Sequence, residues 1–238
     1  MLIVVADRLR NLLFVLVYIV LLLVGLPVLL VCAVFGLREA FVAYGQWMMR
    51  VGRDILGIRV EARGVERLDR RTPYIFMSNH LSFLDGPLLT TVLDRPTRFI
   101  VKRFVVRIPV LGWGMLLVGY VPVDKEGVGE GKSRIARAVS LVKERGYSFV
   151  IFPEGTRSLD GQLQPFRRGG FFLALETGSP IVPISIKGSY ELMPRRKWLI
   201  RKGHVQITFH EPIPVTGYTP ETLTELMEKA RTVIASAL

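Results

Sequence analysis

The amino-acid sequence predicts an α/β domain with a mixed, largely parallel sheet flanked by helices, preceded by an N-terminal membrane-embedded helical segment. Three observations predict this fold class. Residues 12–37 form an apolar run without a charged residue. After residue 54 the chain carries a series of short β-rich runs, and helical patterns alternate with these runs. Such alternation is typical of a sheet on which helices pack.

The length and charge of the chain set limits on its organisation and partners. A chain of 238 residues can hold one sizeable core and an appendage. We expect membrane-associated helices over residues 1–53 and the α/β domain over residues 54–238. The formal net charge of +12 favours a polyanionic partner, either nucleic acid or an anionic bilayer. Cys32 is the single cysteine, which excludes an intramolecular disulfide.

The N-terminal run is long enough to cross a membrane, because a spanning helix needs about 20 apolar residues. Gly25 and Pro27 lie near the middle of this run and predict an interruption. A more amphipathic stretch follows at residues 41–51. One membrane span and a helical hairpin that dips into one leaflet are both compatible with this pattern, and we favour the hairpin. A cleaved signal peptide is disfavoured, because no A-x-A-like site follows the run.

The elements of the α/β domain follow from hydrophobic periodicity. Strands are expected at residues 57–62, 74–77, 98–101, 119–123, 148–152, 181–186 and 204–209. A helix is expected over residues 132–145, with Gly146 as its C-terminal cap. The last segment starts at Thr219 and Pro220 and repeats apolar residues at helical spacing as far as Ile234.

A histidine and an aspartate, His80 and Asp85, come shortly after the expected strand at 74–77. Five residues along a continuous helix turn through about 500°, which would place the two side chains on different faces. We therefore expect His80 to precede the helix and Asp85 to reach back from an early turn. The carboxylate then fixes one imidazole nitrogen, and the other can take a proton from a bound hydroxyl. For an isolated pair, the alternative is that His80 caps a helix and Asp85 is merely solvated.

A second polar cluster, residues 152–157, also follows directly after an expected strand. Ligands collect at the carboxyl ends of strands in α/β sheets, so the two clusters could share one cleft. Arg157 offers a planar fork for bidentate contact with a phosphate. Gly155 permits close backbone approach, and Glu154 could either hydrogen-bond a substrate hydroxyl or brace the arginine.

Four sequence blocks carry a resemblance to a known family. HLSFLD at 80–85, GYVPVD at 119–124, FPEGTR at 152–157 and VPISIKGSY at 182–190 resemble the blocks of the glycerophospholipid acyltransferases. The closest resemblance is to the bacterial 1-acyl-glycerol-3-phosphate acyltransferases. It implies a glycerol-3-phosphate acyltransferase-like fold with N-terminal membrane-associated helices, and an acyltransferase domain over residues 54–238. One departure is Lys125, because the family's second block often ends in Asp-Arg and this chain has Asp124 and Lys125.

The resemblance implies roles for particular residues. His80 and Asp85 would form the catalytic pair, while Lys102 and Arg157 would bind the phosphate of the acceptor. The complete substrate-binding set implied by the family is Lys102, Glu154, Gly155, Thr156 and Arg157. His80 would remove a proton from the acceptor hydroxyl as it attacks the thioester carbonyl, without a covalent acyl-enzyme. Backbone N–H groups near the helix after His80 would stabilise the oxyanion.

The implied reaction transfers a fatty acyl group from an acyl thioester to the free hydroxyl of 1-acyl-glycerol-3-phosphate, giving phosphatidate. The implied co-substrate is an acyl carrier protein or coenzyme A thioester, with no cofactor and no metal. Membrane lipids are expected as partners and nucleic acid is not. The catalytic domain is expected on the cytoplasmic face of the inner membrane.

Two alternatives to this function remain at the level of the sequence. Another lysophospholipid or a lyso-aminolipid could be the acceptor, because related enzymes share similar blocks. A non-enzymatic basic membrane-binding module is the alternative from another class, but it leaves both polar clusters unexplained. The basic segment at 195–202 suits either the interface of an anionic membrane or a solvated loop. Acyl chain length and oligomeric state are open.

Overall fold

The computed structural model describes residues 2–109, 111–123 and 128–238, and within them one seven-stranded sheet in the order β1-β7-β6-β2-β5-β3-β4. The strands are β1 (Ile58–Arg63), β2 (Ile75–Ser78), β3 (Thr97–Lys102), β4 (Val121–Val123), β5 (Ser148–Ile151), β6 (Ile181–Lys187) and β7 (Gly203–Phe209). Each predicted strand is confirmed, with ends that move by one or two residues. Only β6 and β7 pair antiparallel, so the predicted mixed, largely parallel sheet is also confirmed.

The strand directions decide where polar side chains can meet. Strands β6, β2, β5, β3 and β4 run parallel to one another, so their carboxyl ends lie along one edge of the sheet. The central strands β2 and β5 are buried at every position. A strand buried on both faces consists of near-continuous apolar residues, as in the run Ile75, Phe76 and Met77. The charged side chains next to these strands therefore lie in the segments that follow them.

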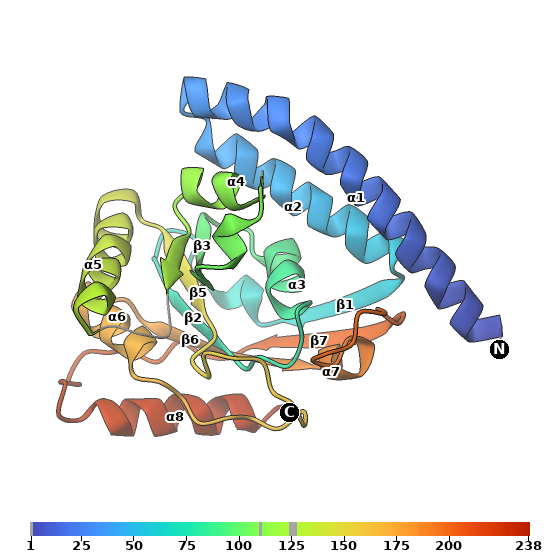
Figure 1. The fold of residues 1–238 in the computed structure, drawn as a ribbon. Coiled ribbons are helices and arrows are strands. Elements are labelled where there is room, and N and C mark those ends of the chain that lie inside the picture. Colours follow the sequence, from blue (N-terminus) through green and yellow to red (C-terminus); the bar gives the residue numbers. More distant parts are fainter. Residues whose placement is uncertain (1, 110, 124–127) are drawn as a thin grey trace.

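Helices cover both faces of the sheet (Figure 1). One face packs against α3 (Asp85–Val92) and the N-terminal helices, in a core that includes Phe76, Leu89 and Val150. The other face packs against α5 (Val128–Arg145), α6 (Gly169–Thr177) and α8 (Leu223–Ala235). Shorter elements complete the domain: η1 (Val65–Arg67), η2 (Val105–Arg107), α4 (Leu111–Leu117) and α7 (Ser189–Leu192).

The two predicted helices of the domain differ in how well their starts were placed. The helix expected over 132–145 is confirmed within α5, and Gly146 follows it with φ +65°. The last helix begins at Leu223, so the predicted start at Thr219 and Pro220 is wrong. The Thr222 hydroxyl accepts from the Thr219 backbone N–H at 2.9 Å, in the turn that precedes the first residue of α8.

The N-terminal segment is a helical hairpin, in which α1 (Leu2–Phe35) is followed by an antiparallel α2 (Arg38–Ile55) (Figure 1). The predicted interruption at Gly25 and Pro27 is wrong, because α1 continues through both residues. The absent side chain of Gly25 makes room for the Tyr44 ring of α2, which would lie 3.2 Å from a Cβ there. Pro27 is exposed and removes one helical hydrogen bond without ending the helix. The chain turns instead at Gly36, where φ is +67°.

The hairpin is joined to the α/β domain by a buried arginine. Arg98 of β3 is fully buried and pairs with Glu39 of α2. Its guanidinium carbon lies 3.9 Å from the centre of the Tyr147 ring, and the Tyr147 hydroxyl donates to Glu39 at 3.0 Å. Helix α1 from Val5 to Phe35 is long and apolar enough to cross a membrane. The structure thus ties a helical hairpin, whose first helix could cross a membrane, to the strand next to β5.

Candidate active site

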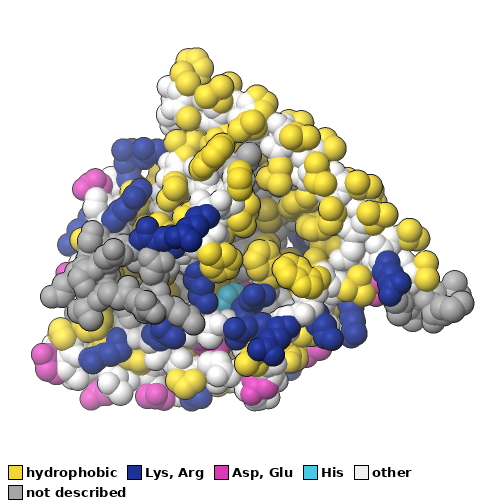
Figure 2. Space-filling view, viewed as in Figure 1, with side chains coloured by type: hydrophobic (Ala, Val, Ile, Leu, Met, Phe, Trp, Pro, Cys, Tyr) yellow, Lys and Arg dark blue, Asp and Glu magenta, His cyan; other side chains and the backbone are white. Residues whose placement is uncertain are grey.

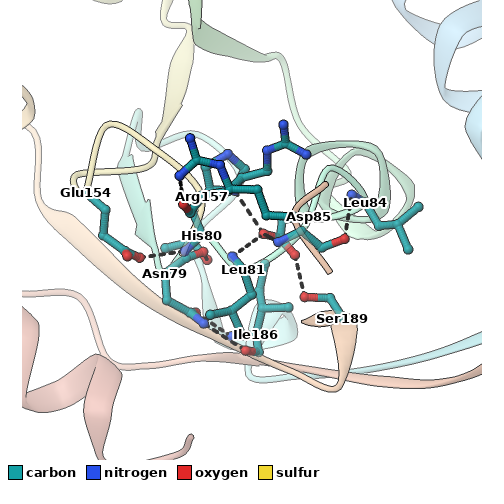
Figure 3. A network of polar contacts seen from close by, with 12 residues as sticks. Asn79, His80, Leu81, Leu84, Asp85, Glu154, Arg157, Ile186 and Ser189 are labelled. Carbon is teal, nitrogen blue, oxygen red and sulfur yellow. Dashed lines mark hydrogen bonds and ion pairs between the residues drawn. The ribbon is translucent and has the colours of Figure 1, made fainter. Parts of the chain in front are cut away.

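His80 and Asp85 are in direct contact at the carboxyl edge of the sheet (Figure 3). His80 lies in the loop after β2, and Asp85 is the first residue of α3. The His80 Nδ1 and the Asp85 Oδ2 are 2.9 Å apart. The Asp85 side chain is completely buried, whereas the His80 side chain is 20% exposed. This is the geometry that the five-residue spacing predicts, with the histidine before the helix and the aspartate reaching back.

Among the described residues, four hydrogen-bond donors hold the Asp85 carboxylate. Besides His80, its Oδ2 accepts from the backbone N–H groups of Leu81 at 2.7 Å and Ser82 at 2.8 Å. Its Oδ1 accepts from the Ser189 hydroxyl at 2.6 Å. These bonds fix the carboxylate and with it the imidazole. The backbone N–H groups of Leu81 and Ser82 are thus engaged by Asp85, and the expected oxyanion donors near the helix after His80 stay a prediction.

The second cluster holds His80 from the opposite side. Because β2 and β5 are adjacent, with Met77 opposite Ile151, the loops after them meet. The Phe152 ring stacks on the imidazole with a centroid distance of 4.0 Å and an interplanar angle of 16°. The His80 carbonyl accepts from the Ser158 N–H at 2.8 Å. With Nδ1 engaged by Asp85, the partly exposed ring offers Nε2 to a bound hydroxyl.

Glu154 is a support for the His80 loop. One carboxylate oxygen accepts from the His80 backbone N–H at 2.6 Å, and the other accepts from the Gln164 backbone N–H at 3.0 Å. Burial raises the pKa of Glu154 to about 7, and the two hydrogen bonds only partly oppose that rise. In the structure both oxygens of Glu154 are engaged by backbone N–H groups, and its expected role toward a substrate hydroxyl or Arg157 stays a prediction.

Arg157 lies half-buried at the mouth of the site, together with a second arginine. The Arg195 guanidinium donates to the Arg157 carbonyl at 3.0 Å. Burial lowers the pKa of Arg157, and the positive charge of Arg195 lowers it further. The Arg157 guanidinium carbon also lies 5.7 Å from the centre of the exposed Phe83 ring. Two guanidinium groups at one mouth favour an anion with more than one negative charge.

The remaining predicted residues lie at the same edge of the sheet. Lys102 ends β3, which pairs with β5. Gly155 has φ +70°, and a Cβ there would lie 2.7 Å from the Arg167 side chain, so the close approach is to that arginine. Thr156 is half-buried in the same turn. Asp124 and Lys125 of the second block lie outside the described residues.

Ser189, Asn79 and Phe152 are site residues to which the sequence analysis gave no role. Asn79 donates to the Ile186 carbonyl at 2.8 Å and accepts from the Ile186 N–H at 2.7 Å, which ties the His80 loop to β6 (Figure 3). Arg195 was assigned only to a basic segment that faces either a membrane or solvent. The sequence feature that could have identified Asn79, Phe152 and Ser189 is their place in the chain. Each lies within two residues of the end of a strand in the same sheet.

The surroundings of the site are divided between cationic and apolar surface. Figure 2 shows a histidine side chain in a hollow, with Lys and Arg side chains next to it and a broad hydrophobic surface above it. Within the described ranges, no group of three or more His, Cys, Asp or Glu side chains is placed to hold a metal ion. The chemistry that this arrangement supports is removal of a proton from a hydroxyl whose molecule is anchored by an anionic group.

Comparison with known proteins identifies acyltransferases that are similar to this chain. The acyltransferase family model matches residues 59–187. A chloroplast 1-acyl-sn-glycerol-3-phosphate acyltransferase from Brassica napus is 39% identical over 157 residues, which cover 65% of this chain and 45% of that protein. A 1-acyl-sn-glycerol-3-phosphate acyltransferase alpha from Homo sapiens is 30% identical over 201 residues, covering 84% of this chain and 71% of that protein. The chain thus spans less than half the length of the plant relative.

A solved structure resembles the whole chain. The crystal structure of the 1-acyl-sn-glycerophosphate acyltransferase PlsC from Thermotoga maritima superposes with a TM-score of 0.84 and 25% sequence identity. The superposition covers 100% of this chain and 97% of that one. The likeness therefore includes the N-terminal hairpin as well as the sheet.

We expect Glu154→Gln to destabilise the fold by an amount that depends on pH. The amide nitrogen of glutamine cannot accept, so one of the two partly buried backbone N–H groups loses its partner, at about 1–3 kcal/mol. The pKa of Glu154 is about 7 in the folded protein against an ordinary 4.5, so the folded state binds more protons between these values. The stability that protonation of Glu154 contributes is full below the ordinary pKa and is lost as the pH rises through about 7.

Urea unfolding in detergent, measured from acidic to mildly alkaline pH, would test this. The stability advantage of the wild type over Glu154→Gln should shrink as the pH rises and then level off. Glu176→Gln, which changes an exposed glutamate at the end of α6, is the matched control and should show no such trend. A difference between wild type and Glu154→Gln that stays constant with pH would contradict the assignment.

Proposed function

The chain belongs to the acyltransferase family, and on that premise we propose that it transfers a fatty acyl group from a thioester to the free hydroxyl of 1-acyl-glycerol-3-phosphate, forming phosphatidate. The observation that carries the proposal is the His80–Asp85 pair, 2.9 Å apart, beside Arg157, whose backbone carbonyl accepts from the Arg195 guanidinium (Figure 3). The names of the relatives support the same reaction. Incubation of the purified protein with lysophosphatidate and a labelled acyl thioester, with phosphatidate as the readout, tests it.

The proposed chemistry is direct transfer with His80 as general base. Its Nε2 takes the proton of the acceptor hydroxyl as the oxygen attacks the thioester carbonyl, and Asp85 stabilises the imidazolium that forms. Collapse of the tetrahedral intermediate forms the ester and breaks the carbon–sulfur bond. The imidazolium then returns the proton to the departing thiolate. No side chain is acylated, and no cofactor takes part.

The acceptor is proposed to bind through its phosphate at Arg157 and Arg195. Planar guanidinium groups match phosphate oxygens in pairs, and two of them complement a phosphomonoester, which carries close to two negative charges at neutral pH. Burial and a neighbouring cation both lower the pKa of Arg157, and a bound dianion would relieve the repulsion between the two arginines. Lys102, at the end of the neighbouring strand, is a further phosphate-binding candidate. Acceptors with a phosphodiester or no phosphate fit this pair less well.

The acyl donor and the location complete the proposal. An acyl carrier protein or coenzyme A thioester serves as donor, and membrane lipids supply the acceptor. The catalytic domain lies on the cytoplasmic face of the inner membrane. The apolar helix α1, which is joined to the domain through α2 and Glu39, supports membrane attachment. The high net positive charge supports an anionic membrane surface as the neighbour of the domain.

We expect His80→Ala to remain folded and membrane-bound while acyl transfer falls by about 10²- to 10⁴-fold, the usual contribution of a general base. The measurement is kcat for phosphatidate formation. His204→Ala, which removes a half-exposed histidine on β7 that contacts Glu61, is the control and should keep wild-type turnover. Near-normal turnover by His80→Ala would end the proposed mechanism.

Ser189→Ala should lower kcat by about tenfold or more and leave the KM for the acceptor unchanged. The Ser189 hydroxyl donates to a buried carboxylate, and hydrogen bonds to charged groups contribute about 1.5–3 kcal/mol. Ser189→Thr keeps the hydroxyl and should restore most of the activity. The control is Ser185→Ala, which removes a buried β6 hydroxyl that donates to Ile234, away from Asp85. Equal losses in Ser189→Ala and Ser185→Ala would show that Ser189 only supports the fold.

For Arg157→Ala the expected change is a rise of about tenfold or more in the KM for lysophosphatidate, with a smaller effect on kcat, because a charge-assisted contact to the phosphate is lost. Steady-state kinetics would be measured with lysophosphatidate and with monoacylglycerol, which lacks the phosphate. The KM should rise for lysophosphatidate and not for monoacylglycerol. Arg168→Ala is the matched control, since this exposed arginine donates to Pro220 away from the site. Unchanged acceptor kinetics in Arg157→Ala would count against the phosphate site.

A further inference from the structure

Helix α4 (Leu111–Leu117) buries its smallest residues and exposes its largest. Gly112 and Gly114 are its buried residues, whereas Trp113 is 57% exposed and Leu116 is 37% exposed. A helix on a water-soluble protein normally turns its large apolar side chains toward the core. The orientation of α4 is the reverse of this arrangement. Contact with water does not favour such an orientation, because it exposes large apolar side chains.

Packing fixes this orientation. A Cβ on Gly114 would collide with the Phe41 ring of α2, and a Cβ on Gly112 would collide with the Val106 carbonyl. Both contacts need the glycine side of α4 to face the protein. Rotation of the helix to bury Trp113 would therefore force a bulky side chain into space that only a glycine fits.

The segment before α4 shows the same exposure. Phe104 is 59% exposed and Ile108 is 41% exposed, on either side of η2. Phe104, Ile108, Trp113 and Leu116 are here called the 104–116 patch. Arg107 is exposed within the same segment, so a cation accompanies these apolar groups. Aromatic, aliphatic and basic side chains of this kind combine where a protein meets a membrane interface.

The 104–116 patch is continuous with the apolar surface of the hairpin. Helix α4 contacts α1 and lies beside α2 (Figure 1). The hydrophobic surface in Figure 2 extends over these elements toward the hollow that holds a histidine. Large exposed apolar side chains recur along α1, as at Leu9, Leu16, Leu23 and Leu30. The patch therefore extends a surface that already suits lipid.

We propose that the 104–116 patch is a second membrane-contacting element, which enters the acyl region of the same leaflet as the hairpin. Its partner is a lipid bilayer, because the patch adjoins a helix long and apolar enough to span one. Phe83, which is 51% exposed and next to Arg157, lies at the mouth of the site. The mouth then faces the bilayer, and a lipid acceptor can reach His80 while its acyl chain stays in the leaflet. This inference rests on the proposed membrane location but not on the proposed reaction.

Quenching of Trp113 fluorescence by lipids brominated on their acyl chains tests the proposal on the full-length protein. Trp47→Phe and Trp198→Phe leave Trp113 as the single tryptophan. In vesicles of brominated lipid, its emission should lose most of its intensity relative to unbrominated vesicles. The control carries Phe at all three tryptophan positions and Glu228→Trp on α8, on the far side of the sheet from the hairpin (Figure 1), and should keep its intensity.

Trp113 emission that resists quenching as the control does would overturn the proposal. So would protection of Trp113 that increases with protein density in the vesicles, because a second copy of the chain would then cover the patch. Quenching does not depend on turnover, so its outcome is independent of the acyltransferase assay. As a second measurement, Trp113→Ser with Leu116→Ser should slow acylation of vesicle-borne acceptor severalfold and leave the rate with detergent-dispersed acceptor unchanged. An equal loss in both assays would contradict the proposal.

Discussion

The site depends on one completely buried carboxylate, Asp85, whose polar oxygens must be satisfied by hydrogen bonds within the protein. Its donors come from two distant parts of the chain: the loop after β2 supplies the imidazole of His80 and the backbone N–H groups of Leu81 and Ser82, and the segment after β6 supplies the hydroxyl of Ser189. Their bonds to Asp85 can form together only when β2, α3 and the end of β6 are in place. The catalytic geometry is thus a consequence of the complete fold, and small displacements at Ser189 would reach the imidazole through Asp85.

The sheet explains why chemistry gathers at one edge. Strands β2 and β5 are buried throughout and are neighbours, and their only polar side chains are the small hydroxyls of Ser78 and Ser148. Their polar neighbours follow immediately after the strand ends, where the loops from both strands meet. Glu154 and Phe152 then support His80 from β5, while Asn79 ties the same loop to Ile186 of β6. Parallel alignment of these strands converts separate sequence blocks into one site.

Local sequence patterns predicted those features of the fold and the site that are determined by residues close together in the chain. The strands were readable because apolar runs of β-branched and aromatic residues bounded by turns need little tertiary information. The His80–Asp85 contact could be predicted because it depends only on the five-residue spacing between the two side chains. Arg195 and Ser189 were not, since they lie 38 and 104 residues from the groups they contact, and only strand order brings them close. The prediction of an interruption at Pro27 was wrong because the tendency of proline to break helices was derived for helices in water. That tendency is weaker in an apolar helix that packs on another helix.

The position of the site between two kinds of surface matches the shape of the proposed acceptor. A lysophospholipid phosphate has an apolar tail at one end, a dianion at the other and its free hydroxyl between them. The guanidinium groups of Arg157 and Arg195 lie on one side of the mouth, and the exposed Phe83 continues toward apolar surface. With the phosphate at the arginines and the tail in the leaflet, the hydroxyl is left near the partly exposed imidazole of His80. Specificity for this acceptor then arises from the binding of its phosphate and of its acyl tail. His80 needs no additional contact with the acceptor to provide that specificity.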